Sequence, residues 1–241
     1  MNYQETLDYL YTFLDSEANL PRRSTEFNLP RTRALLDAVG APDRALRCVV
    51  IAGTKGKGST AALLEAILRA GGYRTGLWTS PHLHTYRERI QVDRMAISRE
   101  QLIELVARFR PTIDAFDAAQ YGLPSVFEVG FALALCWFTA QRVDLVVLEV
   151  GLGGRYDSAN AVEPILSIIT SISYDHTAIL GETLGAIAYQ KAGIARAGVP
   201  LLTGPQPPDA QAMIAQVAAE VGAQLVVAGA VGAGAKPLSL R

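Results

Sequence analysis

A glycine-rich loop with two lysines lies between a strand pattern and a helix pattern. It reads Gly53-Thr54-Lys55-Gly56-Lys57-Gly58-Ser59-Thr60, after the apolar run Leu46 to Ala52 and before the helical segment Thr60 to Ala70. Glycines let backbone N–H groups approach phosphate oxygens at the amino end of a helix. Lys57 would contact the β- and γ-phosphates of a nucleotide, and the hydroxyl of Ser59 or Thr60 would bind Mg²⁺. A plain turn with exposed lysines is the weaker alternative, although the spacing is a shortened variant in which Ser59 follows Gly58 where the general pattern has lysine.

An acidic residue ends a strongly apolar strand pattern. The segment Val143 to Val150 places Glu149 at the carboxyl end of a strand that is too apolar for the edge of a sheet. A carboxylate in that position is costly unless it is paired, and Mg²⁺ held between it and nucleotide phosphates is a natural partner. A hydrogen bond from a neighbouring loop is the alternative.

Histidines follow two other strand patterns. His176, in Ser173-Tyr174-Asp175-His176-Thr177, comes after the apolar run Ile165 to Ser171, so we expect it beside Glu149 at the same edge of the sheet. There it would complete a metal shell or contact phosphate, with a hydrogen-bonded structural histidine as an equal alternative. His82 and His84 follow the strand pattern Tyr73 to Ser80, and they either line the same site or are solvated.

A lysine occupies the apolar face of the helix predicted over Glu182 to Ala197. Leu184, Ile187, Ala188 and Lys191 fall at positions i, i+3, i+4 and i+7. Burial would lower the pKa of Lys191 and leave a neutral amine, which can react with carbon dioxide to form a carbamate that ligates metal. Periodicity alone favours the alternative, in which the side chain reaches out to solvent.

Two more segments have the composition of ligand loops. Gly151-Leu152-Gly153-Gly154-Arg155-Tyr156-Asp157-Ser158-Ala159-Asn160 contains more glycine than a connection needs, and Arg155 and Asp157 add opposite charges. The other segment, Ser125-Val126-Phe127-Glu128, begins a helix pattern. Phe127 would stack on a flat ring, whereas we expect Glu128 to stabilise the amino end of the helix rather than to act in catalysis.

The elements that must position these residues alternate between strand and helix. Strands are expected at Leu46 to Ala52, Tyr73 to Ser80, Val143 to Val150, Ile165 to Ser171, Val199 to Thr203 and Gln224 to Ala228, and helices at Gln4 to Asp15, Pro30 to Val39, Thr60 to Ala70, Arg99 to Phe116, Ser125 to Gln141, Glu182 to Ala197 and Asp209 to Val221. This alternation predicts an α/β fold with a mostly parallel sheet flanked by helices, with ligand loops at the carboxyl ends of the strands. We treat 1–241 as one domain, with amino-terminal helices and a lid segment at 1–45, a core at 46–228 and a glycine-rich tail or cut end at 229–241.

The composition excludes several classes of protein. The 241 residues are 50% apolar and 19% charged, which is unlike a disordered chain. A net charge of −1 gives no broad positive field for nucleic acid or an anionic membrane, and the longest apolar run, Val129 to Ala140, is shorter than a membrane span. Cys48 and Cys136 lie in apolar runs and form no metal-type pair. We expect a soluble, cytoplasmic protein whose anionic ligands are held locally.

Taken together, the motifs resemble the folylpolyglutamate synthase and dihydrofolate synthase family of the Mur ligase superfamily. The resemblance rests on the loop Gly53 to Thr60, Ser80-Pro81-His82-Leu83 with Glu88-Arg89-Ile90, Phe127-Glu128, Glu149 to Arg155 with Asp157 and Asn160, Asp175-His176-Thr177, and Lys191-Ala192-Gly193-Ile194. It extends from Pro30 to about Ala228 and implies the amino-terminal part of such a protein, with its P-loop ATP-binding domain.

The resemblance implies ATP-dependent amide ligation. The carboxylate of a pteroate or folate takes the γ-phosphoryl group, and the amine of L-glutamate then displaces phosphate. Two Mg²⁺ ions are implied, the first held by Ser59 and Glu149 and the second by Glu149, His176 and a carbamylated Lys191. Lys57 would stabilise the transferred phosphoryl group together with these ions.

The resemblance also implies a substrate pocket and a longer protein. The candidate substrate residues are His82, Phe127, Arg155, Asp157 and Ser158. Family members continue through the rest of the ATP-binding domain into a carboxyl-terminal domain, both of which lie outside these 241 residues. We therefore expect the chain alone, as a monomer, to bind nucleotide weakly and to ligate poorly or not at all. The alternatives are a different Mur-type ligase and a nucleotide-binding fragment without ligase activity.

Overall fold

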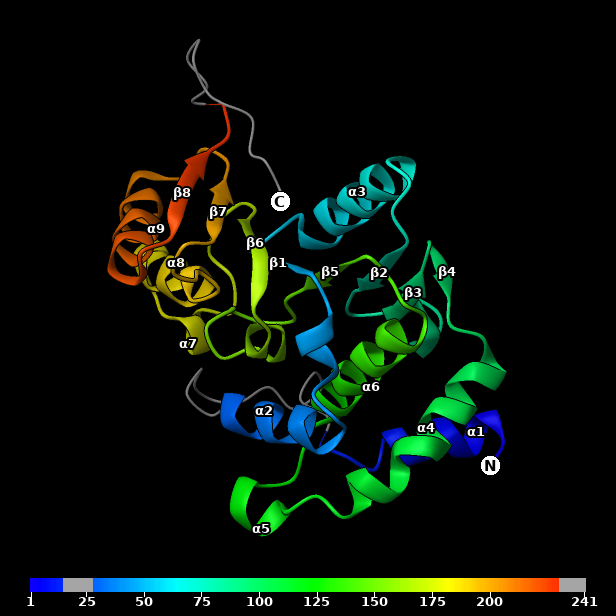
Figure 1. The fold of residues 1–241 in the computed structure, drawn as a ribbon. Helices are drawn as coiled ribbons and strands as arrows, with labels where there is room; N and C mark the ends of the chain where they lie inside the picture. The colour runs from blue at the N-terminus through cyan, green and yellow to red at the C-terminus, as the bar shows by residue number, and fades with distance from the viewer. Residues whose placement is uncertain (15–27, 230–241) are drawn as a thin grey trace.

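The structure is a computed structural model that describes residues 1–14 and 28–229, and within these ranges eight strands form one sheet (Figure 1). Their order across the sheet is β4-β3-β2-β5-β1-β6-β7-β8. The strands are β1 (Cys48–Ala52), β2 (Thr75–Trp78), β3 (Ile90–Val92), β4 (Met95–Ala96), β5 (Leu145–Glu149), β6 (Pro164–Ile169), β7 (Pro200–Thr203) and β8 (Gln224–Val227). The six strands from β2 to β8 in this order are parallel, and β3 and β4 pair antiparallel at one edge. The predicted α/β fold with a mostly parallel sheet is thereby confirmed.

The hairpin of β3 and β4 was not predicted. These strands have only three and two residues, which is too short for a recognisable alternation of apolar and polar positions. Asp93 and Arg94 form the turn between them and have φ angles of 50° and 70°. Positive φ at both central residues gives the turn the twist that a tight hairpin needs.

Helices cover both faces of the sheet. The α-helices are α1 (Tyr3–Leu10), α2 (Leu29–Ala38), α3 (Lys57–Ala70), α4 (Arg99–Asp114), α5 (Ala118–Tyr121), α6 (Val126–Ala140), α7 (Thr177–Leu180), α8 (Leu184–Ala192) and α9 (Pro208–Val221), and short 3₁₀ helices span Pro42–Ala45, Tyr86–Arg89 and Ser158–Ala161. Figure 1 shows α3 on one side of the central strands and α6 on the other, with α1 and α4 beyond α6. In this described part of the chain, no helix is both long and apolar enough to cross a membrane.

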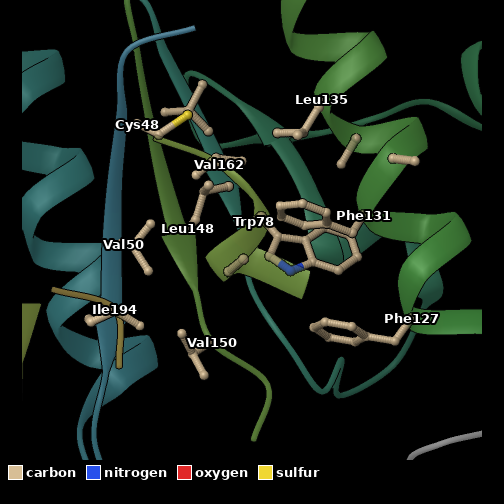
Figure 2. Close-up of a cluster of buried hydrophobic side chains, with 14 of the residues drawn as sticks. Cys48, Val50, Trp78, Phe127, Phe131, Leu135, Leu148, Val150, Val162 and Ile194 are labelled. Atoms are coloured by element: carbon tan, nitrogen blue, oxygen red, sulfur yellow. The ribbon is translucent and has the colours of Figure 1, made fainter. Parts of the chain in front are cut away.

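The central strand β1 has both faces buried, which explains why it reads as a continuous apolar run. Val49 and Ile51 pack under α3, whereas Cys48 and Val50 belong to the larger cluster on the opposite face. Figure 2 shows this larger cluster, in which Cys48, Val50 and residues of β5 face the aromatic side chains of α6. The interpretation of Cys48 as a core residue is confirmed, since its side chain is fully buried and unpaired with another cysteine.

The predicted boundaries of three helices were wrong. Helix α1 ends at Leu10 rather than Asp15, a residue that lies outside the described ranges together with the rest of 15–27. Helix α3 begins at Lys57, because the preceding Gly56 adopts a left-handed conformation that starts the helix inside the glycine loop. Helix α8 is shorter than predicted, since the Thr183 side chain caps its start and Gly193 follows its last residue. The predicted tail is described only at residue 229, and the proposed division of the chain at 45 and 228 stays a prediction.

Candidate active site

The glycine loop joins β1 to α3 and carries backbone donors that the helix itself does not use. Because α3 begins at Lys57, the N–H groups of Lys57, Gly58 and Ser59 belong to its first turn, where no carbonyl of the preceding turn accepts them. These donors and the helix dipole favour an anion in front of the helix. Gly53 has a φ of 147°, and a Cβ built on it would clash with Thr170 Oγ1, so a larger residue does not fit there.

The first half of the loop is held by the segment that follows β6. The Thr54 backbone N–H donates to Ser171 O at 2.7 Å, and its hydroxyl exchanges hydrogen bonds of 3.1 Å with the Ser173 backbone. The Thr170 hydroxyl donates to Lys55 O at 2.8 Å. These contacts fix the path of the loop backbone without using any N–H group of the first turn of α3.

Two lysines converge on one carbonyl of the loop. Lys57 Nζ donates to Gly53 O at 3.1 Å and Lys191 Nζ donates to the same oxygen at 2.9 Å. Lys191 is only 3% exposed, so its side chain does not reach out to solvent as periodicity alone had favoured. Burial, and then the charge of Lys57, lower the pKa of Lys191 to about 8. The side chain of Lys191 thus points into the protein, and its carbamylation stays a prediction.

Glu149 ends β5 and lies against the first turn of α3. It pairs with Ile51 in the sheet register and is 6% exposed. A Cβ built on Gly58 would lie 3.3 Å from Glu149 Oε1, and the Ser80 N–H donates to Oε2 at 3.2 Å. The neighbouring-loop hydrogen bond that the sequence left open is therefore present.

Burial raises the pKa of Glu149, although N–H groups of Ser80 and Gly58 and the charge of Lys57 oppose this shift. The carboxylate therefore lacks enough positive charge around it. A divalent cation beside the carboxylate would supply that charge, so Glu149 fits the predicted role of a Mg²⁺ ligand.

The predicted second ion has less support from the side chains present. His176 lies exposed in a left-handed conformation at the start of α7, with Nε2 3.7 Å from Asp175 Oδ1. Across the described ranges no group of three or more histidine, cysteine, aspartate or glutamate side chains is placed to hold a metal ion. The predicted set contains only two such residues, Glu149 and His176, with Ser59 and Lys191 completing it.

Asp157 stabilises the loop that follows β5. Its Oδ2 accepts from the N–H groups of Gly151 and Leu152 at 3.0 and 3.1 Å, and its Oδ1 accepts from Ala159 N–H at 2.9 Å. The residue is buried, and burial raises the pKa of its carboxyl to about 6 against the effect of these donors. Both oxygens thus bind the backbone of its own loop.

Arg155 points away from Asp157. Its guanidinium lies 3.8 Å from the centroid of the Tyr189 ring, and Nη2 donates to Tyr189 O at 3.2 Å. This places it against α8, where Gly193 lies so close to Arg155 Cβ that a methyl group there would clash. The structure does not bring Arg155 and Asp157 together as an opposite pair, and their roles toward a ligand stay predictions.

Phe127 lies beside the loop that Asp157 holds. Its ring makes an edge contact with Trp78 at 5.5 Å, and Phe127 Cζ lies 2.9 Å from a Cβ built on Gly151 (Figure 2). The 9% exposure of Phe127 leaves its ring largely within the cluster. Only glycine at position 151 permits this close approach of ring and backbone.

Ser158 is linked to a partly buried ion pair. Its hydroxyl lies 3.3 Å from Thr32 Oγ1, which in turn donates to Glu128 Oε1 at 3.1 Å. Glu128 also forms a capping box with Ser125 and an ion pair of 2.9 Å with Arg31. The prediction that Glu128 stabilises the start of its helix is confirmed.

His82 lies in the loop after β2. Its Nδ1 accepts from Arg89 Nε at 2.9 Å, and its ring lies 6.0 Å from that of Tyr86. Glu88 fixes this loop by accepting the backbone N–H groups of Leu83, His84 and Thr85 at 2.8 to 2.9 Å. His82 is therefore positioned by neighbours within its own segment.

Known proteins with similar sequences share one activity in their names. No protein-family model matches the chain. A dihydrofolate synthase/folylpolyglutamate synthase of Bacillus subtilis is 43% identical over 187 residues, which are 77% of this chain and 44% of that protein. A folylpolyglutamate synthase of Lacticaseibacillus casei is 37% identical over 225 residues, 93% of this chain and 51% of the relative. The chain belongs to the folylpolyglutamate synthase/dihydrofolate synthase family.

A solved structure of a family member supports the same assignment. A folylpolyglutamate synthase complex with AMPPCP and folate superposes with a TM-score of 0.86 at 37% identity, covering 94% of this chain and 54% of that one. The chain thus spans about half the length of the relatives it matches. The family and fold that the motifs implied are confirmed, whereas the roles of individual residues in this family member stay predictions.

The sequence reasoning missed the residues that support the site. Thr170 and Ser173 hold the glycine loop, and Arg31 and Thr32 hold Glu128 beside Ser158. Thr170, Ser171 and Ser173 are small polar residues at the carboxyl end of a predicted parallel strand, with the apolar Ile172 between them. Since ligand loops of such sheets lie at these ends, that position was a usable signal.

Proposed function

We propose that the chain is the ATP-binding part of a ligase that adds L-glutamate to the carboxylate of a folate or dihydropteroate. The observation that carries the proposal is the position of Glu149, an undercompensated carboxylate against the first turn of α3. The helix terminus favours an anion and Glu149 lies beside it, so a divalent cation between them would let the carboxylate and a phosphate group occupy the same site. Because the chain belongs to a ligase family, we infer that the bound ATP serves ligation.

The phosphate groups bind through residues of one loop and one neighbouring helix. The N–H groups of Lys57 and Ser59 donate to phosphate oxygens, while that of Gly58 keeps its bond to Glu149, and the Lys57 ammonium leaves Gly53 O to pair with the terminal phosphates. Without carbamylation, Lys191 keeps its bond to Gly53 O and adds buried positive charge behind the loop. Carbamylation would replace this role with that of a metal ligand. Gly58 leaves room for the Glu149 carboxylate.

Mg²⁺ would be held by Glu149 and the Ser59 hydroxyl, with His176 and a carbamylated Lys191 proposed for a second ion. When bound, the metal neutralises charge on the phosphate oxygens. The protein contributes positioning: the folate carboxylate attacks the γ-phosphorus, ADP leaves, and the glutamate amine then displaces phosphate from the acyl phosphate. No side chain of the protein has to become a covalent intermediate.

The folate end of the site is proposed at Phe127. Phe127 would face the ring system of the substrate, with Ser158 and His82 beside it. The contacts of Asp157 favour a role in shaping the Gly151–Asn160 loop, so that its effect on substrate binding is indirect. Arg155 contributes in the same manner through its stacking on Tyr189.

Nucleotide binding tests the proposal in this chain. Titration calorimetry with AMPPCP should give Mg²⁺-dependent binding to the 241-residue chain. We expect Lys57→Ala to weaken binding at least about tenfold through loss of a charge-assisted contact. Glu149→Gln should remove the Mg²⁺ dependence while the protein stays folded. Arg142→Ala is the matched control, because Arg142 is exposed and lies before the amino end of β5, at the opposite edge of the sheet from the loop.

Ligation is tested in a longer protein that includes these residues. ADP release is measured with dihydropteroate or tetrahydrofolate, each with and without L-glutamate. Release that depends on both the acceptor and glutamate supports the proposal, and release that ignores glutamate contradicts it. The same assay on the 241-residue chain tests the expectation that it ligates poorly or not at all. We further propose that it acts as a monomer in the cytoplasm.

A further inference from the structure

The ladder between β6 and β7 ends before the part of the chain that supports the glycine loop. The last paired residues are Ile169 of β6 and Thr203 of β7. Beyond Ile169, residues 170–173 run beside the loop and make its hydrogen bonds. On the side away from the loop, these residues need another partner to stay in place, since backbone groups left without one cost free energy.

That partner is the side chain of Gln206. Its Oε1 accepts from the Ile172 backbone N–H at 2.9 Å, and its Nε2 donates to Thr170 O and to Thr203 Oγ1, the latter at 2.9 Å. A residue in a parallel ladder likewise donates to one residue of its neighbour and accepts from the residue two positions further along. The carboxamide of Gln206 therefore extends the ladder by one rung after β7 has ended.

Two sides of residues 170–173 are thus occupied. On one side lies Gln206, and on the other lies the loop, where Thr54 N–H donates to Ser171 O at 2.7 Å. The Thr170 hydroxyl also fills the space beside Gly53 where a side chain would stand. If Thr170 moved, its contacts with Gly53 and Lys55 would therefore change as well.

The chemistry at this position requires glutamine. Glutamate lacks the N–H that Thr170 O accepts and would place a negative charge near the phosphates, whereas asparagine is one methylene shorter. Pro205 and Pro207 flank the residue and restrict its backbone, which aims the side chain. Each donor and acceptor type that the amide offers is used.

We propose that Gln206 is a positioning residue for nucleotide binding, acting through residues 170–173 on the glycine loop. This inference rests on the proposed nucleotide site. Gln206 does not itself touch the first turn of α3. It limits the positions that Thr54 and Lys55 take, so that the donors of α3 face the phosphates before the nucleotide arrives.

The test combines affinity with amide exchange in the 241-residue chain. Gln206→Ala and Gln206→Met, which keeps the side-chain length without hydrogen bonds, should each weaken AMPPCP binding about tenfold. Hydrogen exchange should become faster at the Ile172 amide, which loses its acceptor, and also at Thr54 on the far side of the segment. Gln216→Ala is the matched control, because Gln216 is exposed on α9 and its side chain bonds Glu220 of the same helix.

The outcomes separate this inference from the proposed function. If wild type binds AMPPCP and both Gln206 variants bind equally well, or if exchange at Thr54 is unchanged, the positioning role is wrong. If wild type does not bind, the proposed nucleotide site fails. The link from Gln206 to the loop is then decided by exchange alone: faster exchange at both Ile172 and Thr54 supports it, and a change confined to Ile172 overturns it.

Discussion

Lys57 and Lys191 donate to the same carbonyl oxygen, that of Gly53, at 3.1 and 2.9 Å. Two ammonium groups on one neutral acceptor repel each other, and Lys57 is the second cause, after burial, of the lowered pKa of Lys191. A natural fold retains such crowding where an anion will bind. The pair is therefore best understood as part of a phosphate site in which Lys57 is the movable cation and Lys191 the fixed one.

The buried position of Lys191 predicts a pH dependence of stability. Its pKa is about 8 in the folded protein and 10.5 in a model compound, so between these values the unfolded chain binds the additional proton. The free energy of unfolding should therefore rise as pH increases from about 8 to 10.5, by at most about 3 kcal/mol. Urea unfolding of wild type and Lys191→Met over this range measures it, with Lys55→Met as the exposed-lysine control. Parallel curves for wild type and Lys191→Met would exclude the effect.

Gly58 offers a way to disturb Glu149 without removing it. Alanine at this position would bring a methyl group 3.3 Å from Glu149 Oε1 while increasing helix propensity in the first turn of α3. We expect Gly58→Ala to unfold at the same or a slightly higher temperature and to bind Mg²⁺–AMPPCP at least about tenfold more weakly. Calorimetry with a parallel melting curve separates the two effects. If Gly58→Ala binds Mg²⁺–AMPPCP as tightly as wild type, the position of the Glu149 carboxylate is not important for nucleotide binding.

Gly56 provides the contrasting substitution. It has a φ of 83° and no atom within 4 Å of a built Cβ, so alanine there meets backbone strain but no side chain. Gly56→Ala should lower the free energy of unfolding by about 1 kcal/mol. The structure therefore predicts that Gly58→Ala loses more affinity than Gly56→Ala. It also predicts that Gly58→Ala is the more stable of the two variants.

The sequence was sufficient to place Glu149 at the end of a buried strand and Lys191 on the apolar face of a helix, although periodicity alone wrongly favoured a Lys191 side chain that reaches solvent. A strand with an apolar run to its carboxyl end and a helix with a period of 3.6 each fix where such a residue faces. The sharing of Gly53 O was not predictable, because the carbonyl lies 138 positions from Lys191 and meets it only after the sheet has formed. The direction of Arg155 was missed for the same reason, since the packing of Gly193 against it turns the guanidinium toward Tyr189.

Asp157 should matter first for stability. Asp157→Ala removes the acceptor of three backbone N–H groups in a buried loop, so we expect the free energy of unfolding to fall by about 2 to 4 kcal/mol. Asp157→Asn keeps an acceptor oxygen and should lose less. Urea denaturation of both variants, beside Asp117→Ala as a control that removes one exposed helix cap, measures the difference. A stable Asp157→Ala with lost folate affinity would instead make Asp157 a direct substrate contact.

Trp78 can report occupancy of the proposed folate site. The chain has two tryptophans, Trp78 and Trp137. Trp78 is fully buried and touches Phe127. Trp137 lies on the same helix as Phe127 but ten residues after it, which is about 15 Å from Phe127 by helical rise. In Trp137→Phe, binding of folate beside Phe127 should change the emission of Trp78 with a saturable dependence on ligand concentration. In Trp78→Phe the remaining signal should show only the linear attenuation caused by absorption of the ligand, which serves as the correction. Equal responses in the two variants would place the ligand elsewhere, because a contact at Phe127 must affect the nearer indole more strongly.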